Sequence, residues 1–119
     1  MKVLIVDDSS TVRQQVRMAL TGAGFDVIEA CDGEEGFQKV ESASPAVVIC
    51  DVNMPRMNGI EMVEKIKASG RSVPIVMLTT EGQPELIQRA RAAGAKGWIV
   101  KPFKPDLLVG AVTKLGKAA

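Results

Sequence analysis

Histidine and tyrosine are absent from this sequence of 119 residues, and its aromatic residues are one tryptophan and three phenylalanines. Without histidine the chain has no Ser-His or Cys-His catalytic pair and no phosphohistidine of its own. Any histidine chemistry in which it takes part must therefore come from a partner. Its two cysteines, Cys31 and Cys50, cannot build a disulfide framework or, without histidine, complete a zinc site. We interpret both as small buried hydrophobic residues.

A strong net charge and long apolar runs are also missing. With 15 basic and 14 acidic residues the formal net charge is +1, which provides no global field for nucleic acid or an anionic membrane. The apolar start ends at two aspartates, too early for a signal-peptide core, and no segment approaches transmembrane length. We predict a cytoplasmic protein, a single domain over residues 1–119, with a frayed C-terminal tail from Lys114.

Five short apolar runs, several rich in valine and isoleucine, predict five β-strands. They are Val3–Val6, Val27–Ala30, Ala46–Cys50, Ile75–Leu78 and Trp98–Val100. The segments between them have helical periodicity, with candidate N-caps at Asp8, Ser9 or Ser10, glycines near helix ends at Gly24 and Gly70, and Pro84 and Pro105 placed to begin helices. Strands that alternate with helices predict an α/β fold with a doubly wound five-stranded parallel sheet.

Polar side chains follow four of the five predicted strands. Asp7 and Asp8 follow the first strand, Asp51 and Asn53 the third, Thr79 and Thr80 the fourth, and Lys101 the fifth. Ligands of such sheets bind outside the carboxyl ends of the strands. We therefore expect these side chains to form one site.

The three carboxylates of the predicted site require a cation, because each close pair repels by about 4 kcal/mol at an effective dielectric near 20. Oxygen ligands with room for water suit Mg²⁺ or Mn²⁺. A divalent ion, Lys101 and a threonine hydroxyl can neutralise a transferring phosphoryl group while a carboxylate attacks phosphorus. Asp51 is the natural nucleophile.

Each of these residues also has a simpler interpretation. Taken alone, Asp8 is an N-cap, Thr79 a turn residue and Lys101 a solvated strand end. Their joint placement favours the site. The sequence contains no GxxxxGK[ST] loop, no GxGxxG after the first strand and no GxSxG turn, which argues against nucleotide binding and serine hydrolysis.

Four segments carry a resemblance to a known family. They are VLIVDDS at 3–9, DVNMPRMNG at 51–59, MLTTEG at 77–82 and KGWIVKPF at 96–103. In these motifs the sequence resembles the receiver domains of two-component response regulators, and among them the single-domain, CheY-like chemotaxis type. The resemblance covers essentially the whole chain and implies a flavodoxin-like (βα)5 fold with strand order 2-1-3-4-5.

The resemblance also implies roles for the site residues. Asp51 is expected to accept a phosphoryl group from the phosphohistidine of a partner kinase. Asp8 and Asp51 are expected to bind Mg²⁺ directly, Asn53 through its main-chain carbonyl, and Asp7 mainly through water. Lys101 is expected to contact the phosphoryl oxygens and to precede a cis peptide bond at Pro102.

A switch and its partners are implied in the same way. Thr79 is expected to close over the phosphate, and Trp98, where the family usually has Tyr or Phe, to move with it or to remain a fixed anchor. The face built by the fourth helix, fifth strand and fifth helix is expected to bind an output protein, such as a flagellar motor switch or another motility component. A phosphatase partner and a monomeric state are also expected.

Three alternatives stay open on the sequence alone. The chain could be a phosphate sink or phosphorelay intermediate without a direct output. A haloacid-dehalogenase-like phosphatase would also use an aspartyl phosphate and Mg²⁺, but its nucleophile belongs in a DxD motif after the first strand. A flavodoxin-like FMN module shares the strand order but needs a phosphate loop where this sequence has Asp7 and Asp8.

Overall fold

The computed structural model describes residues 1–118, in which five strands alternate with five helices. The strands are β1 (Lys2–Val6), β2 (Asp26–Ala30), β3 (Val47–Cys50), β4 (Ile75–Thr79) and β5 (Gly97–Val100). The helices are α1 (Ser10–Gly22), α2 (Gly33–Ala43), α3 (Gly59–Ala68), α4 (Pro84–Ala92) and α5 (Pro105–Ala118). All strand pairs are parallel and the order is β2-β1-β3-β4-β5, as predicted.

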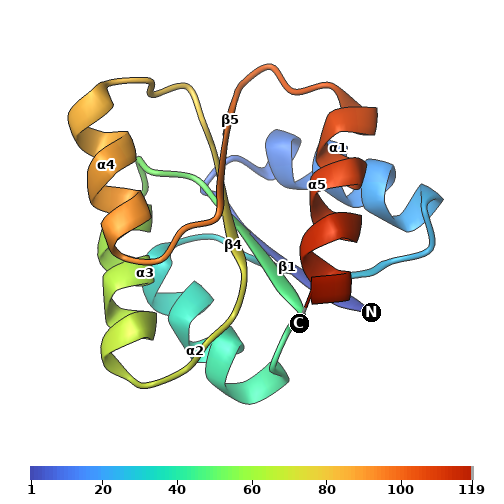
Figure 1. Cartoon of the computed structure of the whole chain (residues 1–119). Coiled ribbons are helices and arrows are strands. Elements are labelled where there is room, and N and C mark those ends of the chain that lie inside the picture. Colours follow the sequence, from blue (N-terminus) through green and yellow to red (C-terminus); the bar gives the residue numbers. More distant parts are fainter. Residues whose placement is uncertain (119) are drawn as a thin grey trace.

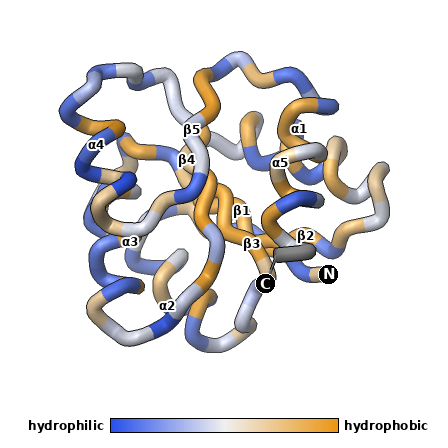
Figure 2. The backbone as a smooth tube through the Cα atoms, viewed as in Figure 1, coloured by the Kyte–Doolittle hydropathy of each residue, from blue (hydrophilic) through white to orange (hydrophobic). Residues whose placement is uncertain are grey.

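The helices cover both faces of the sheet: α1 and α5 lie on one face, and α2, α3 and α4 on the other (Figure 1). Successive residues of β1 point to opposite faces, so that Leu4 packs toward α2 and α3 while Ile5 packs toward α1 and α5. Hydrophobic residues concentrate in the central strands (Figure 2). This burial on both faces explains why the central strands β1, β3 and β4 are almost continuous apolar runs.

Local signals fix the helix ends. The Ser9 hydroxyl caps α1 by accepting a hydrogen bond from the Val12 main-chain N–H at 3.3 Å, and Asn58 and Glu61 form a capping box at the start of α3. Pro84 and Pro105 are the first residues of α4 and α5, as predicted. These caps begin the helices just beyond the carboxyl ends of the strands, where the candidate site lies.

Two predictions about local structure were wrong. Residues 114–118 continue α5 and do not fray, because Leu115 packs against the α1/α5 side of the core; residue 119 lies outside the described residues. Cys50 is buried as predicted, but Cys31 is exposed, since it follows the last residue of β2 and precedes the N-cap of α2.

Candidate functional site

Three carboxylates converge beyond the ends of β1 and β3. Asp7 and Asp8 follow β1, Asp51 follows β3, and one oxygen of each lies within 4.8 Å of the others. Asp7 and Asp51 are 1% and 7% exposed, whereas Asp8 is open to solvent. The parallel register of β1 and β3 produces this convergence, because Val6 and Cys50 are paired neighbours in the sheet.

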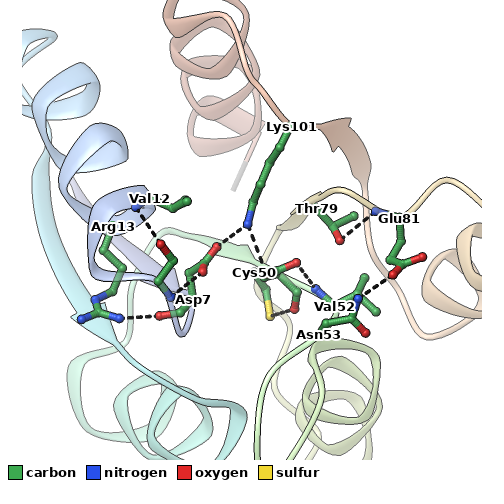
Figure 3. Close-up of polar contacts among 11 residues, drawn as sticks. Asp7, Val12, Arg13, Cys50, Val52, Asn53, Thr79, Glu81 and Lys101 are labelled. Carbon is green, nitrogen blue, oxygen red and sulfur yellow. Dashed lines mark hydrogen bonds and ion pairs between the residues drawn. The ribbon is translucent and has the colours of Figure 1, made fainter.

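Lys101 reaches into the same cluster from the end of β5 (Figure 3). Its Nζ atom donates to Oδ2 of Asp7 at 2.8 Å and to Oδ2 of Asp51 at 3.1 Å. Burial alone would lower the pKa of Lys101, but the hydrogen bonds and charges of the two aspartates outweigh burial and raise it. Lys101 is therefore held as an ammonium ion between two carboxylates.

Burial has the opposite consequence for Asp7. Loss of solvent raises the pKa of this carboxyl group, although hydrogen bonds from Lys101 and from the main-chain N–H of Ser9 oppose the rise. One ammonium faces three carboxylates, which leaves the cluster with an excess of negative charge. A further cation would offset this excess.

Main-chain contacts hold Asp51 in place. Its Oδ1 atom accepts a hydrogen bond from the Val52 N–H at 2.7 Å, and its carbonyl oxygen accepts one from the buried thiol of Cys50 at 3.2 Å. Gly59 packs so closely that an added β-carbon would lie 1.8 Å from that carbonyl oxygen. The loop after β3 can return past Asp51 only because residue 59 has no side chain.

Thr79, Asn53 and Trp98 meet around Glu81. The Glu81 carboxylate accepts a hydrogen bond from the Asn53 side-chain amide at 2.6 Å, and its carbonyl oxygen accepts one from the Trp98 indole at 2.9 Å. The buried Thr79 hydroxyl accepts from the Glu81 main-chain N–H at 3.2 Å. Among the described residues no hydrogen bond joins Thr79 to Asp51.

Of the residues predicted for the site, the structure brings Asp7, Asp8, Asp51 and Lys101 into one cluster. Asn53, Thr79 and Trp98 instead contact Glu81. The peptide bond between Lys101 and Pro102 is cis, as the resemblance implied. One contact was missed: Arg13 donates from Nη1 to the carbonyl oxygen of Asp7 at 2.6 Å. The sequence carried no signal for it beyond a basic residue one turn into α1.

The cluster suits a divalent metal ion. Its ligands are carboxylate oxygens, which hard cations prefer, and the exposed side at Asp8 leaves room for water ligands. Neither cysteine is among the clustered side chains, and the sequence has no histidine. The donor set therefore fits Mg²⁺ or Mn²⁺ better than Zn²⁺.

Comparison with known proteins decides the family. Residues 3–113 match the family model described as the response regulator receiver domain. The chain belongs to the response regulator receiver family. It is a phosphoacceptor signalling domain of the CheY type rather than a catalytic enzyme, and its acidic pocket is formed by Asp7, Asp8 and Asp51.

Individual relatives of this receiver domain are chemotaxis proteins. It is 45% identical over 112 residues to chemotaxis protein CheY1 of Helicobacter pylori strain J99, covering 91% of this chain and 90% of that protein. It is 38% identical over 117 residues to chemotaxis protein CheY of Thermotoga maritima, covering 98% of each. The solved structure of chemotaxis protein CheY4 of Vibrio cholerae superimposes with a TM-score of 0.89 at 45% identity, over 96% of this chain and 97% of that one.

Proposed function

We propose that Asp51 accepts a phosphoryl group from the phosphohistidine of a partner kinase, in a reaction that depends on Mg²⁺. The Lys101 ammonium that bridges Asp7 and Asp51, beside the open carboxylate of Asp8, carries this proposal. A histidine kinase is the partner that receiver-family membership implies. The donor histidine has to be the partner's, since this chain has none.

In the proposed step a carboxylate oxygen of Asp51 attacks phosphorus. The bond between phosphorus and the partner's imidazole nitrogen breaks, and its electron pair leaves with the ring. The Lys101 ammonium lies 3.1 Å from the attacking carboxylate, which supports a role in neutralising charge on the phosphoryl oxygens. In this scheme the domain promotes only its own phosphorylation and dephosphorylation.

Asp8 and Asp51 would hold the metal ion directly, with the main-chain carbonyl of Asn53, and Asp7 would hold it through water. Bound Mg²⁺ supplies positive charge to the phosphoryl oxygens. The convergence of three carboxylate oxygens within 4.8 Å supports this assignment. Asp7 also orients Lys101 through their 2.8 Å hydrogen bond.

A groove next to the site supports docking of the donor. It has a volume of about 780 Å³ and lies between α1 and the segment that joins β5 to α5. Its lining includes Met18, which is 67% exposed, together with Phe103, Pro102 and Lys101. A mostly apolar surface that ends at Lys101 suits a partner that presents histidine from a hydrophobic face.

For the output we propose a switch through Thr79 and Trp98. A phosphoryl oxygen on Asp51 would draw the Thr79 hydroxyl away from the Glu81 N–H, which it now engages at 3.2 Å. The same residue, Glu81, holds the Trp98 indole through its carbonyl oxygen. Movement of the loop after β4 would therefore change the α4-β5-α5 face.

Only Ala90 is buried in α4, which the structure describes throughout, and this weak attachment supports α4 as the responding element. The chemotaxis relatives favour a motility component as the output protein. No helix among the described residues is both long and apolar enough to span a bilayer. A cytoplasmic location, a monomeric state, a phosphatase partner and the extent of the domain over 1–119 stay predictions.

The phosphate-sink alternative shares the same chemistry and differs only in having no output partner. The phosphatase alternative is disfavoured because the candidate nucleophile, Asp51, follows β3 and not β1. The FMN alternative is disfavoured because two carboxylates, Asp7 and Asp8, occupy the end of β1, where a phosphate would have to bind.

Intact mass spectrometry tests the proposal directly. Wild-type protein and Asp51→Asn are incubated with phosphoramidate, with and without Mg²⁺. We expect wild type to gain one phosphate only when Mg²⁺ is present and Asp51→Asn to gain none. A phosphate gain in Asp51→Asn would reject Asp51 as the acceptor, and a gain without Mg²⁺ would reject the role of the metal.

A further inference from the structure

The two adjacent acids after β1 are held very differently. Each polar group of Asp7 has a partner: its N–H donates to the Ala30 carbonyl at 3.1 Å, its side chain accepts from Ser9 and Lys101, and its carbonyl accepts from Arg13. The Asp8 carboxylate is exposed and makes no hydrogen bond or ion pair among the described residues. Its position is therefore set by its own main chain.

The contact from Arg13 acts on that main chain. Nη1 of Arg13 donates to the Asp7 carbonyl oxygen at 2.6 Å, a contact drawn in Figure 3. This carbonyl belongs to the planar peptide group that joins Asp7 to Asp8. Holding its oxygen fixes the orientation of the peptide plane, and with it the direction in which the Asp8 side chain leaves the backbone.

We propose that Arg13 is a positioning residue for the divalent metal ion, holding the Asp7–Asp8 peptide so that both carboxylates face the ion. This inference rests on the proposed metal site. Arg13 touches neither Asp51 nor Lys101 among the described contacts, so it acts only through the backbone of the acid pair.

Arg13 is itself well anchored. Its side chain is 17% exposed, and its Nε atom donates to one carboxylate oxygen of Glu29 on β2 at 3.0 Å. The planar guanidinium thus spans from β2 to the loop after β1 with two donors in a fixed geometry. A lysine carries its donors on one nitrogen and lacks the planar fork with which Nε and Nη1 of Arg13 reach the two acceptors.

The chain offers a matched control in Arg17. Arg17 lies one turn further along α1 and donates from Nε to the other oxygen of Glu29 at 2.6 Å. Among the described residues Arg17 has no hydrogen bond or ion pair with Asp7, and its side chain is 43% exposed. Replacing Arg17 removes a Glu29 partner and a positive charge from the same helix but leaves the Asp7–Asp8 peptide held.

The test is Mn²⁺ binding, followed by the electron paramagnetic resonance signal of the free ion, which needs no phosphorylation. We expect Arg13→Gln to raise the Mn²⁺ dissociation constant about tenfold, as loss of a contact that orients metal ligands does. Arg17→Gln should leave it within about twofold of wild type. Urea unfolding measures the stability of both variants independently of metal binding. If Arg13→Gln does not fold, Arg13→Lys replaces it in the Mn²⁺ measurement.

A double-mutant cycle with Asp8→Asn tests whether Arg13 affects metal binding through Asp8. If Arg13 positions Asp8, Arg13→Gln should weaken Mn²⁺ binding much less when Asp8→Asn is already present. Equal dissociation constants for Arg13→Gln and Arg17→Gln would overturn the inference, as would full additivity with Asp8→Asn. Failure of the proposed metal site looks different, because wild-type protein itself would then bind no Mn²⁺.

Discussion

The ammonium nitrogen of Lys101 lies 2.8 Å from a carboxylate oxygen of Asp7, a residue 94 positions earlier in the chain. The bridge joins the last strand to the first through side chains, although β5 and β1 are not neighbours in the sheet. Lys101 also donates to Asp51, so one positive charge supports two buried carboxylates. Its removal should affect both stability and metal binding.

Lys101→Met should destabilise the metal-free protein by about 2 kcal/mol at pH 7, because two buried carboxylates lose their partner. Mg²⁺ should recover much of that loss by supplying positive charge. Urea unfolding with and without Mg²⁺ measures both effects. Lys104→Met, at an exposed position nearby, is the control and should be near neutral. An equal loss in both variants would contradict the bridging role.

Asp8→Asn should make the metal-free protein somewhat more stable, because the exposed Asp8 carboxylate has no hydrogen bond to lose among the described residues and its removal relieves repulsion from Asp7 and Asp51. The opposite effect should appear with metal. Mg²⁺ at one hundred times its dissociation constant should stabilise wild type by about 2.7 kcal/mol, and the variant much less at the same concentration. Thermal unfolding against Mg²⁺ concentration measures this, and equal stabilisation would remove Asp8 from the site.

Beryllofluoride with Mg²⁺ should change the fluorescence of Trp98, the sole tryptophan, because its indole donates to the Glu81 carbonyl at 2.9 Å in the loop expected to move. Asp51→Asn should show no change under the same conditions. An unchanged spectrum in wild type, together with the phosphate gain by mass, would make Trp98 a fixed anchor instead of a switch.

Gly59→Ala should destabilise the fold by about 3 kcal/mol or more, since a β-carbon there would meet the Asp51 carbonyl oxygen at 1.8 Å and neither backbone can yield cheaply. Gly110→Ala is the matched control. It lies within α5, where no atom of the described residues lies within 4 Å of an added β-carbon, and alanine should stabilise that helix by about 1 kcal/mol. Similar changes in urea midpoint for the two would contradict the close approach at Gly59.

Acid stability should depend on Glu29. The hydrogen bond from Arg17 is the main reason that the pKa of Glu29 lies below its ordinary value of 4.5, with Arg13 adding to it. A lowered pKa in the folded state contributes stability above the ordinary value, and this contribution is lost as the pH falls through the folded value. The difference in unfolding free energy between wild type and Glu29→Gln should therefore be largest near neutral pH and shrink below about pH 4.5. A difference that is constant across this range would refute the ion-pair origin.

The features that the sequence predicted best are those that depend on a single physical rule. Strand positions followed from apolar runs to within one residue at each end, because strands buried on both faces consist mostly of apolar side chains. The gathering of Asp7, Asp51 and Lys101 followed from the parallel sheet, which sends every carboxyl end to one edge. Strand order needed the family resemblance, since periodicity does not say which strands are neighbours.

What the sequence did not predict depends on contacts between distant side chains. Arg13 looks like any basic residue on α1 until the fold places it beside the Asp7 carbonyl. Cys31 was expected to be buried, but its position between β2 and α2 exposes it. The tail from Lys114 was expected to fray because it looked polar. Leu115 packs against the core, and α5 continues through this segment.

Asp51 and Trp98 differ in the number of strands beside them. Asp51 follows β3, which has hydrogen-bonded neighbours on both sides, whereas Trp98 belongs to β5, which pairs with β4 alone. A shift of β5 would break hydrogen bonds along one side, while the same shift of β3 would break them along two. The added charge of the proposed phosphoryl group would thus be held by an interior strand, and the proposed shape change would fall on an edge strand, which fewer hydrogen bonds restrain.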